Sequence, residues 1–257
     1  MRRRGSRRKS DWTPTGSAYT YLAMEATGLI LVAAGQGLRF GADRPKPLVE
    51  LGGSPLVARA LGAFRGFVDH VVLVVPAGEE GAFAAAVAAG VAAPSRLRVV
   101  AGGERRQDSV AAGLAVLEAE VAWVLVHDAA RPLVSARIVQ AVLEATREHG
   151  SAIPVVPVHS TVKETAADGR IERTVPRRAL RLAQTPQGFR RDLLENAYRL
   201  ATAAPTPITF TDDAGLLEAA GTPVFTVPGS PANLKITTPA DLAWARAWLE
   251  SGPTEDS

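Results

Sequence analysis

The sequence predicts an α/β fold built on a doubly wound, mainly parallel sheet. Three observations support this prediction. Strand-like and helix-like segments alternate along most of the chain, the strand-like segments are short apolar runs, and several of them end in glycine-rich or polar turns. Parallel strands are buried on both faces, so they read as continuous apolar runs. At 257 residues the chain is long enough for one substantial domain with a complete core.

The first predicted strand of this Rossmann-like fold, residues 29–34, leads into a turn that favours a phosphate site. Gly35 and Gly37 permit positive φ and a close approach of the backbone to a ligand. Backbone N–H groups at the end of a strand can then bind phosphate oxygens. The spacing is not that of a dinucleotide fingerprint, because Gly41 comes one residue late, and no Walker Gly-Lys-Ser/Thr follows.

Two cations follow the same turn. Arg39 comes two residues after Gly37, and the fixed φ of Pro45 holds Lys46 near the turn. A guanidinium and an ammonium beside bare backbone N–H groups suit a polyphosphate. An ordinary βα turn with two solvated cations is the alternative interpretation.

The remaining elements follow from composition and periodicity. The segment from His70 is almost entirely Val and Leu, as expected of a central strand. Val110, Leu114 and Leu117 recur at helical spacing, and Ser54 is predicted to be the N-cap of the first helix. Strands are predicted at residues 70–76, 97–101, 121–127, 152–158, 223–227 and 233–237, and helices at 54–67, 78–89, 107–118, 135–149, 190–202, 213–220 and 239–249.

A polar segment, residues 159–182, interrupts this alternation. Asp168-Gly169 is a hairpin signal between two strand-like stretches, which predicts a two-stranded arm that leaves the domain. An isolated hairpin is marginally stable in water, so we expect the arm to pack on a second subunit. The chain is therefore predicted to form a homodimer.

The composition excludes several function classes. The sequence has no cysteine, which rules out disulfides, thiolate metal sites and cysteine nucleophiles, and its four histidines are scattered without ligand spacing. No apolar run approaches the roughly 18 residues of a membrane span, so no membrane partner is expected. We expect a cytoplasmic protein.

The basic pI of about 9.6 comes from the start of the chain. Residues 1–23 hold six Lys or Arg and one Asp, so they contribute +5 to a net charge of +3 and the rest carries −2. A near-neutral body does not favour a nucleic-acid partner. Residues 1–23 are predicted to be a disordered tail or a start-site artefact, residues 24–250 the folded domain, and residues 251–257 a frayed end.

Two further predicted strands end in candidate ligand-binding residues. Gly102 and Gly103 provide a bare backbone that can lie along a flat base, and Ser109 adds a hydroxyl; a glycine turn with a helix cap is the alternative. Asp128 follows a buried strand, where a carboxylate can hold Mg²⁺ bound to phosphates, and an N-cap is the competing interpretation. His127 is interpreted as structural.

The last candidates are cations and hydroxyls in the second half of the chain. Arg177 and Thr185 belong to a block in which arginines and threonines suit a phosphate, although a solvated arm would explain its other arginines equally well. Thr211 precedes two Asp residues, and an ordinary helix N-cap is the alternative interpretation of this segment. Lys235 lies among apolar residues, an unusual place for a cation without an anion.

Five motifs in one order then make a resemblance specific. The motifs are Gly35-x-Gly37-x-Arg39, Gly102-Gly103 with Arg105 and Ser109, the run His127-Asp128-Ala129-Ala130-Arg131-Pro132, Gln184-Thr185-Pro186-Gln187 and Asn233-x-Lys235-x-Thr237. Together they resemble the 2-C-methyl-D-erythritol 4-phosphate cytidylyltransferase family of non-mevalonate isoprenoid biosynthesis, over about residues 28–249. The resemblance implies the nucleotide-diphospho-sugar transferase type of fold.

The resemblance also implies roles for individual residues. Arg39, Lys46 and Lys235 would be catalytic cations, and Asp128 would be associated with Mg²⁺ or another divalent cation. The implied nucleotide-binding residues are Ala34, Gly35, Gly37, Gly102, Gly103, Arg105, Ser109 and Ala129, and the implied acceptor-binding residues are Thr161, Arg177, Thr185 and Thr211. The chain departs from the family pattern at Pro47, Ala232 and His159-Ser160. These departures argue against a second acidic contact to the metal or to the acceptor.

The implied reaction joins CTP to a polyol phosphate and releases pyrophosphate. Ribitol 5-phosphate as the acceptor is one alternative, and only the arm, with Thr161 and Arg177, would discriminate it. Uridine or guanosine nucleotides are a second alternative, against which the glycine-rich segment 102–109 argues. A non-catalytic nucleotide-binding protein is a third, and the joint presence of Arg39, Lys46 and Asp128 speaks against it.

Overall fold

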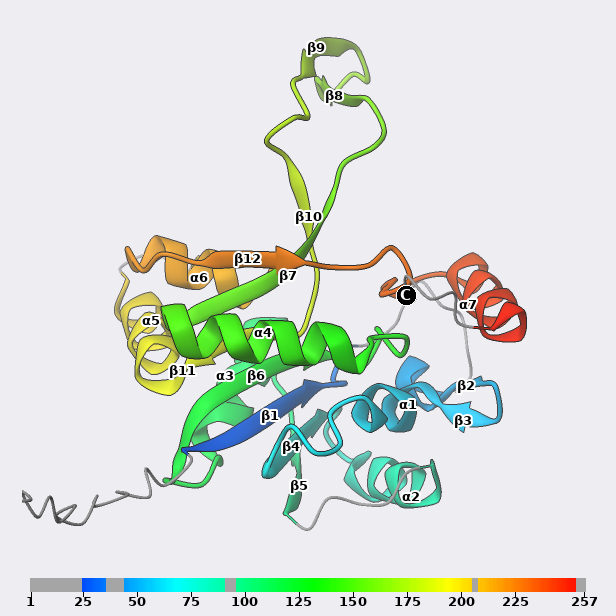
Figure 1. Ribbon diagram of the computed structural model, residues 1–257, viewed down its shortest axis with the longest axis vertical. Helices are drawn as coiled ribbons and strands as arrows, with labels where there is room; N and C mark the ends of the chain where they lie inside the picture. The colour runs from blue at the N-terminus through cyan, green and yellow to red at the C-terminus, as the bar shows by residue number, and fades with distance from the viewer. Residues whose placement is uncertain (1–24, 36–43, 91–95, 205–207, 253–257) are drawn as a thin grey trace, which may run out of the picture.

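The computed structural model describes residues 25–35, 44–90, 96–204 and 208–252, and its central feature is one mostly parallel sheet (Figure 1). Strands β1 (Ala26–Val32), β4 (His70–Val75), β5 (Leu97–Ala101) and β6 (Val121–Asp128) pair in parallel in the order β6-β1-β4-β5. Strands β7 (Ser151–Pro157) and β12 (Phe225–Pro228) are parallel to each other. Strand β11 (Gln187–Arg190) joins the two groups by pairing antiparallel with β6 and β7, and β10 (Arg181–Ala183) pairs antiparallel with β7. The predicted fold class is confirmed.

Helices cover both faces of this sheet, as in a doubly wound fold. Helices α1 (Leu56–Gly62), α2 (Glu80–Gly90) and α4 (Ala136–His149) pack on one face, and α3 (Arg106–Ala115), α5 (Arg191–Ala203) and α6 (Asp213–Ala219) pack on the other. Successive strand residues alternate between the faces: Leu29 and Leu31 contact the first set of helices, and Ile30 contacts the second. Both faces are therefore buried, which explains the apolar runs in the sequence.

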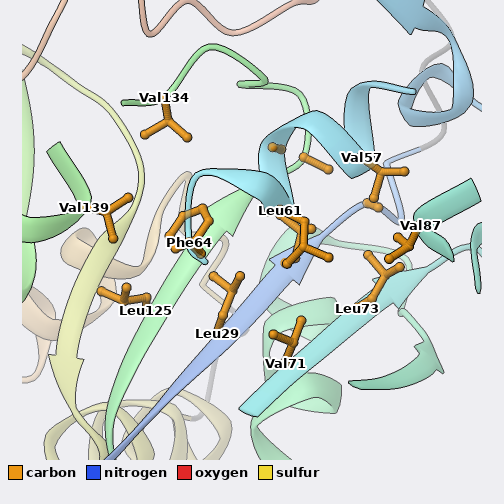
Figure 2. Close-up of a cluster of buried hydrophobic side chains, with 14 of the residues drawn as sticks. Leu29, Val57, Leu61, Phe64, Val71, Leu73, Val87, Leu125, Val134 and Val139 are labelled. Carbon is orange, nitrogen blue, oxygen red and sulfur yellow. The ribbon is translucent and has the colours of Figure 1, made fainter. Parts of the chain in front are cut away.

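Figure 2 shows the core of the first face. Phe64, in the turn after α1, lies among side chains of the central strands and of α4, including Leu29, Leu125 and Val139. All four side chains are fully buried. Full burial of such a side chain contributes about 1.5–3 kcal/mol, so this layer stabilises the strand ends that carry the site.

A smaller cluster supports the other side of the site. Helix α7 (Pro239–Ser251) packs with Leu51, Leu56 and Ile236, next to the short pair β2 (Glu50–Leu51) and β3 (Ser54–Pro55). Thr238 caps α7 and forms a capping box with Asp241. The 3-10 helix η1 (Lys46–Leu48) precedes β2.

The predicted arm is present as a hairpin. Strands β8 (Val162–Thr165) and β9 (Ile171–Val175) pair antiparallel and project from the sheet (Figure 1). Gly169 has φ +84° in the connecting turn, a conformation that glycine adopts without strain. Nearly all side chains of the hairpin are exposed in this single chain.

Two predictions about elements were wrong, and a strand was missed. Ser54 is not an N-cap, because it pairs with Leu51 in β3 and the helix begins at Leu56. Residues 233–237 form no strand, because the N–H of Ile236 donates to Ala130 O at 2.8 Å instead of to a sheet. Strand β11 was not predicted; it contains Gly188, where a Cβ would overlap Thr146 Oγ1 of the adjacent α4.

Both ends of the chain lie partly outside the described residues. The basic segment 1–23 and residues 253–257 lie outside the described residues, whereas Ser251 still belongs to α7. Within the described ranges, no helix combines the length and the apolar character that crossing a membrane requires.

Candidate active site

A cavity of about 350 Å³ lies at the carboxyl ends of β1, β5 and β6. In an open α/β sheet this edge is where ligands bind. Eight of the predicted site residues line this one cavity: Ala34, Gly35, Lys46, Gly103, Arg105, Ser109, Asp128 and Lys235. Gly37 and Arg39 lie outside the described residues.

Lys46 reaches the cavity from the first position of η1. Pro45 precedes it with φ −51°, and Pro47 is buried beside it. The Lys46 ammonium donates a hydrogen bond to Ile236 O at 2.7 Å. Because that carbonyl belongs to the segment that also carries Lys235, the contact brings two lysines from distant parts of the chain to one cavity.

Asp128 forms ion pairs with Lys235 and Arg106 at this cavity. It is the last residue of β6, not an N-cap, since Ser135 caps the next helix. Its Oδ1 accepts from Arg106 Nε at 3.0 Å and its Oδ2 from Lys235 Nζ at 2.7 Å. Burial alone would raise the pKa of Asp128, but Arg106 and Lys235 lower it far below its ordinary range. The carboxylate is therefore ionised at every physiological pH.

Arg106 is the principal site residue that the sequence analysis missed. Its guanidinium also donates from Nη1 to Asp213 Oδ2 at 2.7 Å, so it lies between two buried carboxylates. The neighbouring Arg105 lines the cavity, but its guanidinium pairs with Asp108 at 2.6 Å, and Asp108 Oδ2 also accepts from the N–H of Arg105 at 3.2 Å. The available signal that Arg105 is engaged elsewhere was Asp108 at the third helical position, because an acidic side chain there commonly accepts from the N–H of the N-cap residue.

Ser109 organises the glycine-rich segment. Its Oγ accepts from the N–H of Gly103 at 3.2 Å and can donate to Arg105 O, also at 3.2 Å. The side chain is buried, so the hydroxyl holds the loop that forms this wall of the cavity.

Two predicted nucleotide-binding residues do not line the cavity. Gly102 packs against the wall: a Cβ there would lie 2.5 Å from Ala34 Cβ and 2.7 Å from Ser109 Oγ. Ala129 is fully buried, and its N–H donates to Val32 O at 2.9 Å. Both residues permit close packing at the strand ends.

Thr185 and His127 form a buried hydrogen-bonded pair next to Asp128. Burial lowers the pKa of His127 to about 4, so the ring is neutral at pH 7. Its Nε2 donates to Arg131 O at 3.2 Å, and Nδ1 therefore accepts from the Thr185 hydroxyl at 2.9 Å. Thr185 Oγ1 also accepts from the N–H of Asp128 at 3.1 Å. This geometry agrees with the structural role expected of His127 and gives Thr185 a supporting role.

A second hollow of about 200 Å³ adjoins the first. Arg106, Asp128 and Lys235 line both, and Thr185 and Thr211 line the second alone. Two predicted acceptor-binding residues thus lie on the far side of the same charged group. A substrate in each hollow would meet at Asp128 and Lys235.

The two predicted arm residues lie elsewhere. Thr161 directly precedes β8 and Arg177 follows β9 by two residues, both are exposed, and neither lines the two hollows of its own chain.

The side chains at the cavity indicate how a metal ion could be held. Among the described residues no group of three or more His, Cys, Asp or Glu side chains could hold a metal by itself. Mg²⁺ in nucleotide enzymes needs fewer protein ligands, because phosphates and water supply the rest. Asp128 fits this use, since it is ionised and already has the Lys235 ammonium at 2.7 Å from Oδ2, where another cation could replace it.

Comparisons with known proteins give matches over most of the chain. Residues 27–251 match the family model for 2-C-methyl-D-erythritol 4-phosphate cytidylyltransferase (IspD). The enzyme of that name from Frankia casuarinae is 44% identical over 92% of this chain and 86% of its own length. The one from Pelotomaculum thermopropionicum is 42% identical over 89% and 96%. The crystal structure of the Thermus thermophilus enzyme has a TM-score of 0.71 and 36% identity, covering 88% of this chain and all of the other.

The fold, the cationic cavity at the sheet edge and these matches define an enzyme of the nucleotidyltransferase class. Within that class, this chain belongs to the 2-C-methyl-D-erythritol 4-phosphate cytidylyltransferase family.

Proposed function

We propose that this chain joins CTP and 2-C-methyl-D-erythritol 4-phosphate, giving 4-diphosphocytidyl-2-C-methyl-D-erythritol and pyrophosphate in non-mevalonate isoprenoid biosynthesis. Family membership supports both substrates. The observation that carries the proposal is the convergence of Lys46, Arg106, Asp128 and Lys235 on one cavity at the carboxyl edge of the sheet.

The chemistry is an in-line displacement. A phosphate oxygen of the acceptor forms a bond to the α-phosphorus of CTP, and the bond from that phosphorus to the bridging oxygen of the leaving group breaks. A phosphate monoester has a second pKa of about 6, so the nucleophile is already a dianion at neutral pH. The site therefore needs no general base. The described residues that line the cavity include no histidine or cysteine, which is consistent with such a reaction.

The work left for the protein is positioning and charge. Two polyanions repel each other, and negative charge grows on the leaving pyrophosphate. Lys46 and Lys235 lie where they can offset that charge, and we propose that Arg39, on the sequence resemblance, does the same. Asp128 would orient Lys235 and hold a phosphate-bound Mg²⁺, which supplies further charge neutralisation when bound.

We propose that the triphosphate lies along Ala34 and Gly35, with the cytosine on the Gly103 loop that Ser109 holds in place. The acceptor would occupy the second hollow, beside Thr211. This arrangement puts the two phosphates on either side of Asp128 and Lys235.

We also propose that the protein is a homodimer in which the arm completes the partner's acceptor site. Thr161 and Arg177 are exposed and away from their own chain's hollows. Ile171 on β9 is 57% exposed, and an exposed apolar side chain favours contact with a partner subunit that would cover it. Use of CTP supports a cytoplasmic location.

Pyrophosphate release tests the function. We expect release with CTP and 2-C-methyl-D-erythritol 4-phosphate in the presence of Mg²⁺. Ribitol 5-phosphate as the acceptor, and UTP or GTP as the donor, should give much slower release. Comparable rates with ribitol 5-phosphate would contradict the acceptor assignment, and no release with any acceptor would contradict catalysis.

A further inference from the structure

A chain of polar contacts runs from helix α5 into the wall of the cavity. Tyr198 on α5 donates its hydroxyl to Asp213 Oδ1 at 2.8 Å, and Arg106 Nη1 donates to Asp213 Oδ2 at 2.7 Å. The same guanidinium donates from Nε to Asp128 Oδ1 at 3.0 Å. Residues from α5, α6, α3 and β6 are thus connected up to the carboxylate that binds Lys235.

The residues in this series of polar contacts depend on one another electrostatically. Asp213 is 1% exposed, and within the described ranges the only ion pair it makes is with Arg106. A buried carboxylate without its cation is strongly destabilised, so Asp213 and Arg106 constrain each other's position. Burial and the adjacent Asp213 raise the pKa of Tyr198, so its hydroxyl stays protonated and can donate.

The contact between Arg106 and Asp128 involves one carboxylate oxygen. Arginine commonly binds both oxygens of a carboxylate through two parallel hydrogen bonds. Here Arg106 contacts Oδ1 while another of its nitrogens is held by Asp213, and Oδ2 accepts from Lys235 instead. Arg106 Nη2, the nitrogen that would complete such a pair with Nε, is buried and has no hydrogen-bond partner among the described residues.

We propose that Asp213 and Tyr198 are positioning residues, which hold Arg106 on one oxygen of Asp128 and so keep the other oxygen open to Lys235 or to a phosphate-bound cation. The inference rests on the proposed function, since it assigns these residues to the nucleotide-binding side of that site. A purely structural role, linking α5 and α6 to β6, is the competing explanation.

Asp213→Asn separates the two explanations. It keeps the side chain's size but removes the charge, so Arg106 can turn and bind both oxygens of Asp128. The readout is the ratio of the affinity for the Mn²⁺–CTP complex to the affinity for CTP in EDTA, measured by calorimetry without acceptor. We expect this ratio and kcat each to fall about tenfold or more, the loss of one hydrogen bond to a charged group, while the affinity for CTP in EDTA changes by less than about threefold.

Tyr198→Phe should shift both values in the same direction by a smaller factor. If Tyr198 acts through Asp213, the double variant should be no worse than Asp213→Asn alone, because the two effects are not additive. Asp192→Asn is the matched control, since it removes an exposed carboxylate from α5 that pairs with Arg190. It should leave the affinity ratio and kcat unchanged.

A lower melting temperature with a wild-type affinity ratio and kcat would overturn the proposal and leave only the structural role. If Asp213→Asn does not fold, Tyr198→Phe decides by the same two readouts. Failure of the proposed function looks different: the wild-type protein would then release no pyrophosphate, whereas the affinity ratio would still report on the positioning.

Discussion

Lys235 places its ammonium 2.7 Å from Oδ2 of Asp128, although the two residues are 107 positions apart in the sequence. The contact unites the loop before α7 with the carboxyl end of β6. Lys46 is bound to the same loop through Ile236 O, so two lysines and one aspartate share a cavity. A polyphosphate bound in this cavity would lie among charges of both signs.

Replacing Lys46 by Ala should lower kcat by about 10² or more, because one cation that offsets transition-state charge is lost. Arg39→Ala is expected to have a similar effect on the basis of the sequence resemblance. Steady-state pyrophosphate release measures both. Arg65→Ala, which removes an exposed cation after α1, is the control. Near-wild-type turnover in Lys46→Ala would count against the proposed site.

Asp128→Asn should raise the Mg²⁺ concentration needed for half-maximal activity by about tenfold or more, since a neutral amide is a poorer ligand for a hard cation. Folding must be checked in parallel, because Arg106 and Lys235 both lose their anion. The measurement is a Mg²⁺ titration of the initial rate at fixed CTP. An unchanged titration curve in a folded variant would remove Asp128 from the metal site.

Mixed dimers test whether the arm serves the partner's site. Lys46→Ala and Arg177→Ala homodimers should each be nearly inactive. In a mixed dimer one site has both wild-type residues if the arm crosses to the partner, and neither site does if the arm serves its own chain. We therefore expect activity to return when the two variants are unfolded and refolded together, and a mixture as inactive as its parents would contradict the crossed arrangement.

His127 should make stability depend on pH. Its pKa is near 6.5 in an unfolded chain and about 4 in the folded protein, mainly because of burial. Between these values the unfolded state binds a proton that the folded state does not, so stability is present above about pH 6.5 and is lost as the pH falls towards 4. Between pH 7 and pH 4.5 the loss is about 2 kcal/mol.

Urea unfolding of the wild type and of His127→Gln at several pH values measures this loss. The variant should be less stable at pH 7 but show a flatter dependence between pH 6.5 and 4.5. Asp128 does not interfere in this pH range. The stability that its lowered pKa provides is lost mainly below about pH 4, the ordinary pKa of an aspartate. Parallel curves for the two proteins would contradict the assignment to His127.

Local patterns were enough to predict much of the fold. The apolar runs of β4 and β5 and the capped helix after Ser135 follow from neighbours in sequence, so their positions were predicted closely. Strand β11 was not predictable in this way, because it is short and its Gly188 is required by a contact with Thr146 of another element. The segment with Lys235 looked like a strand, yet tertiary hydrogen bonds hold it as a loop.

The same division applies to the site. The amino-acid sequence alone predicted the doubly wound fold, the hairpin arm and a phosphate site with Lys46 and Asp128 at the strand ends, since glycines, buried strands and isolated charges are local signals, and its resemblance to a known family added Lys235. Only the tertiary structure decided that Arg106, not Arg105, contacts Asp128, and that Asp213 and Tyr198 stand behind it. The physical reason is that a side chain's direction at a helix start depends on which partners the rest of the fold brings within hydrogen-bonding distance.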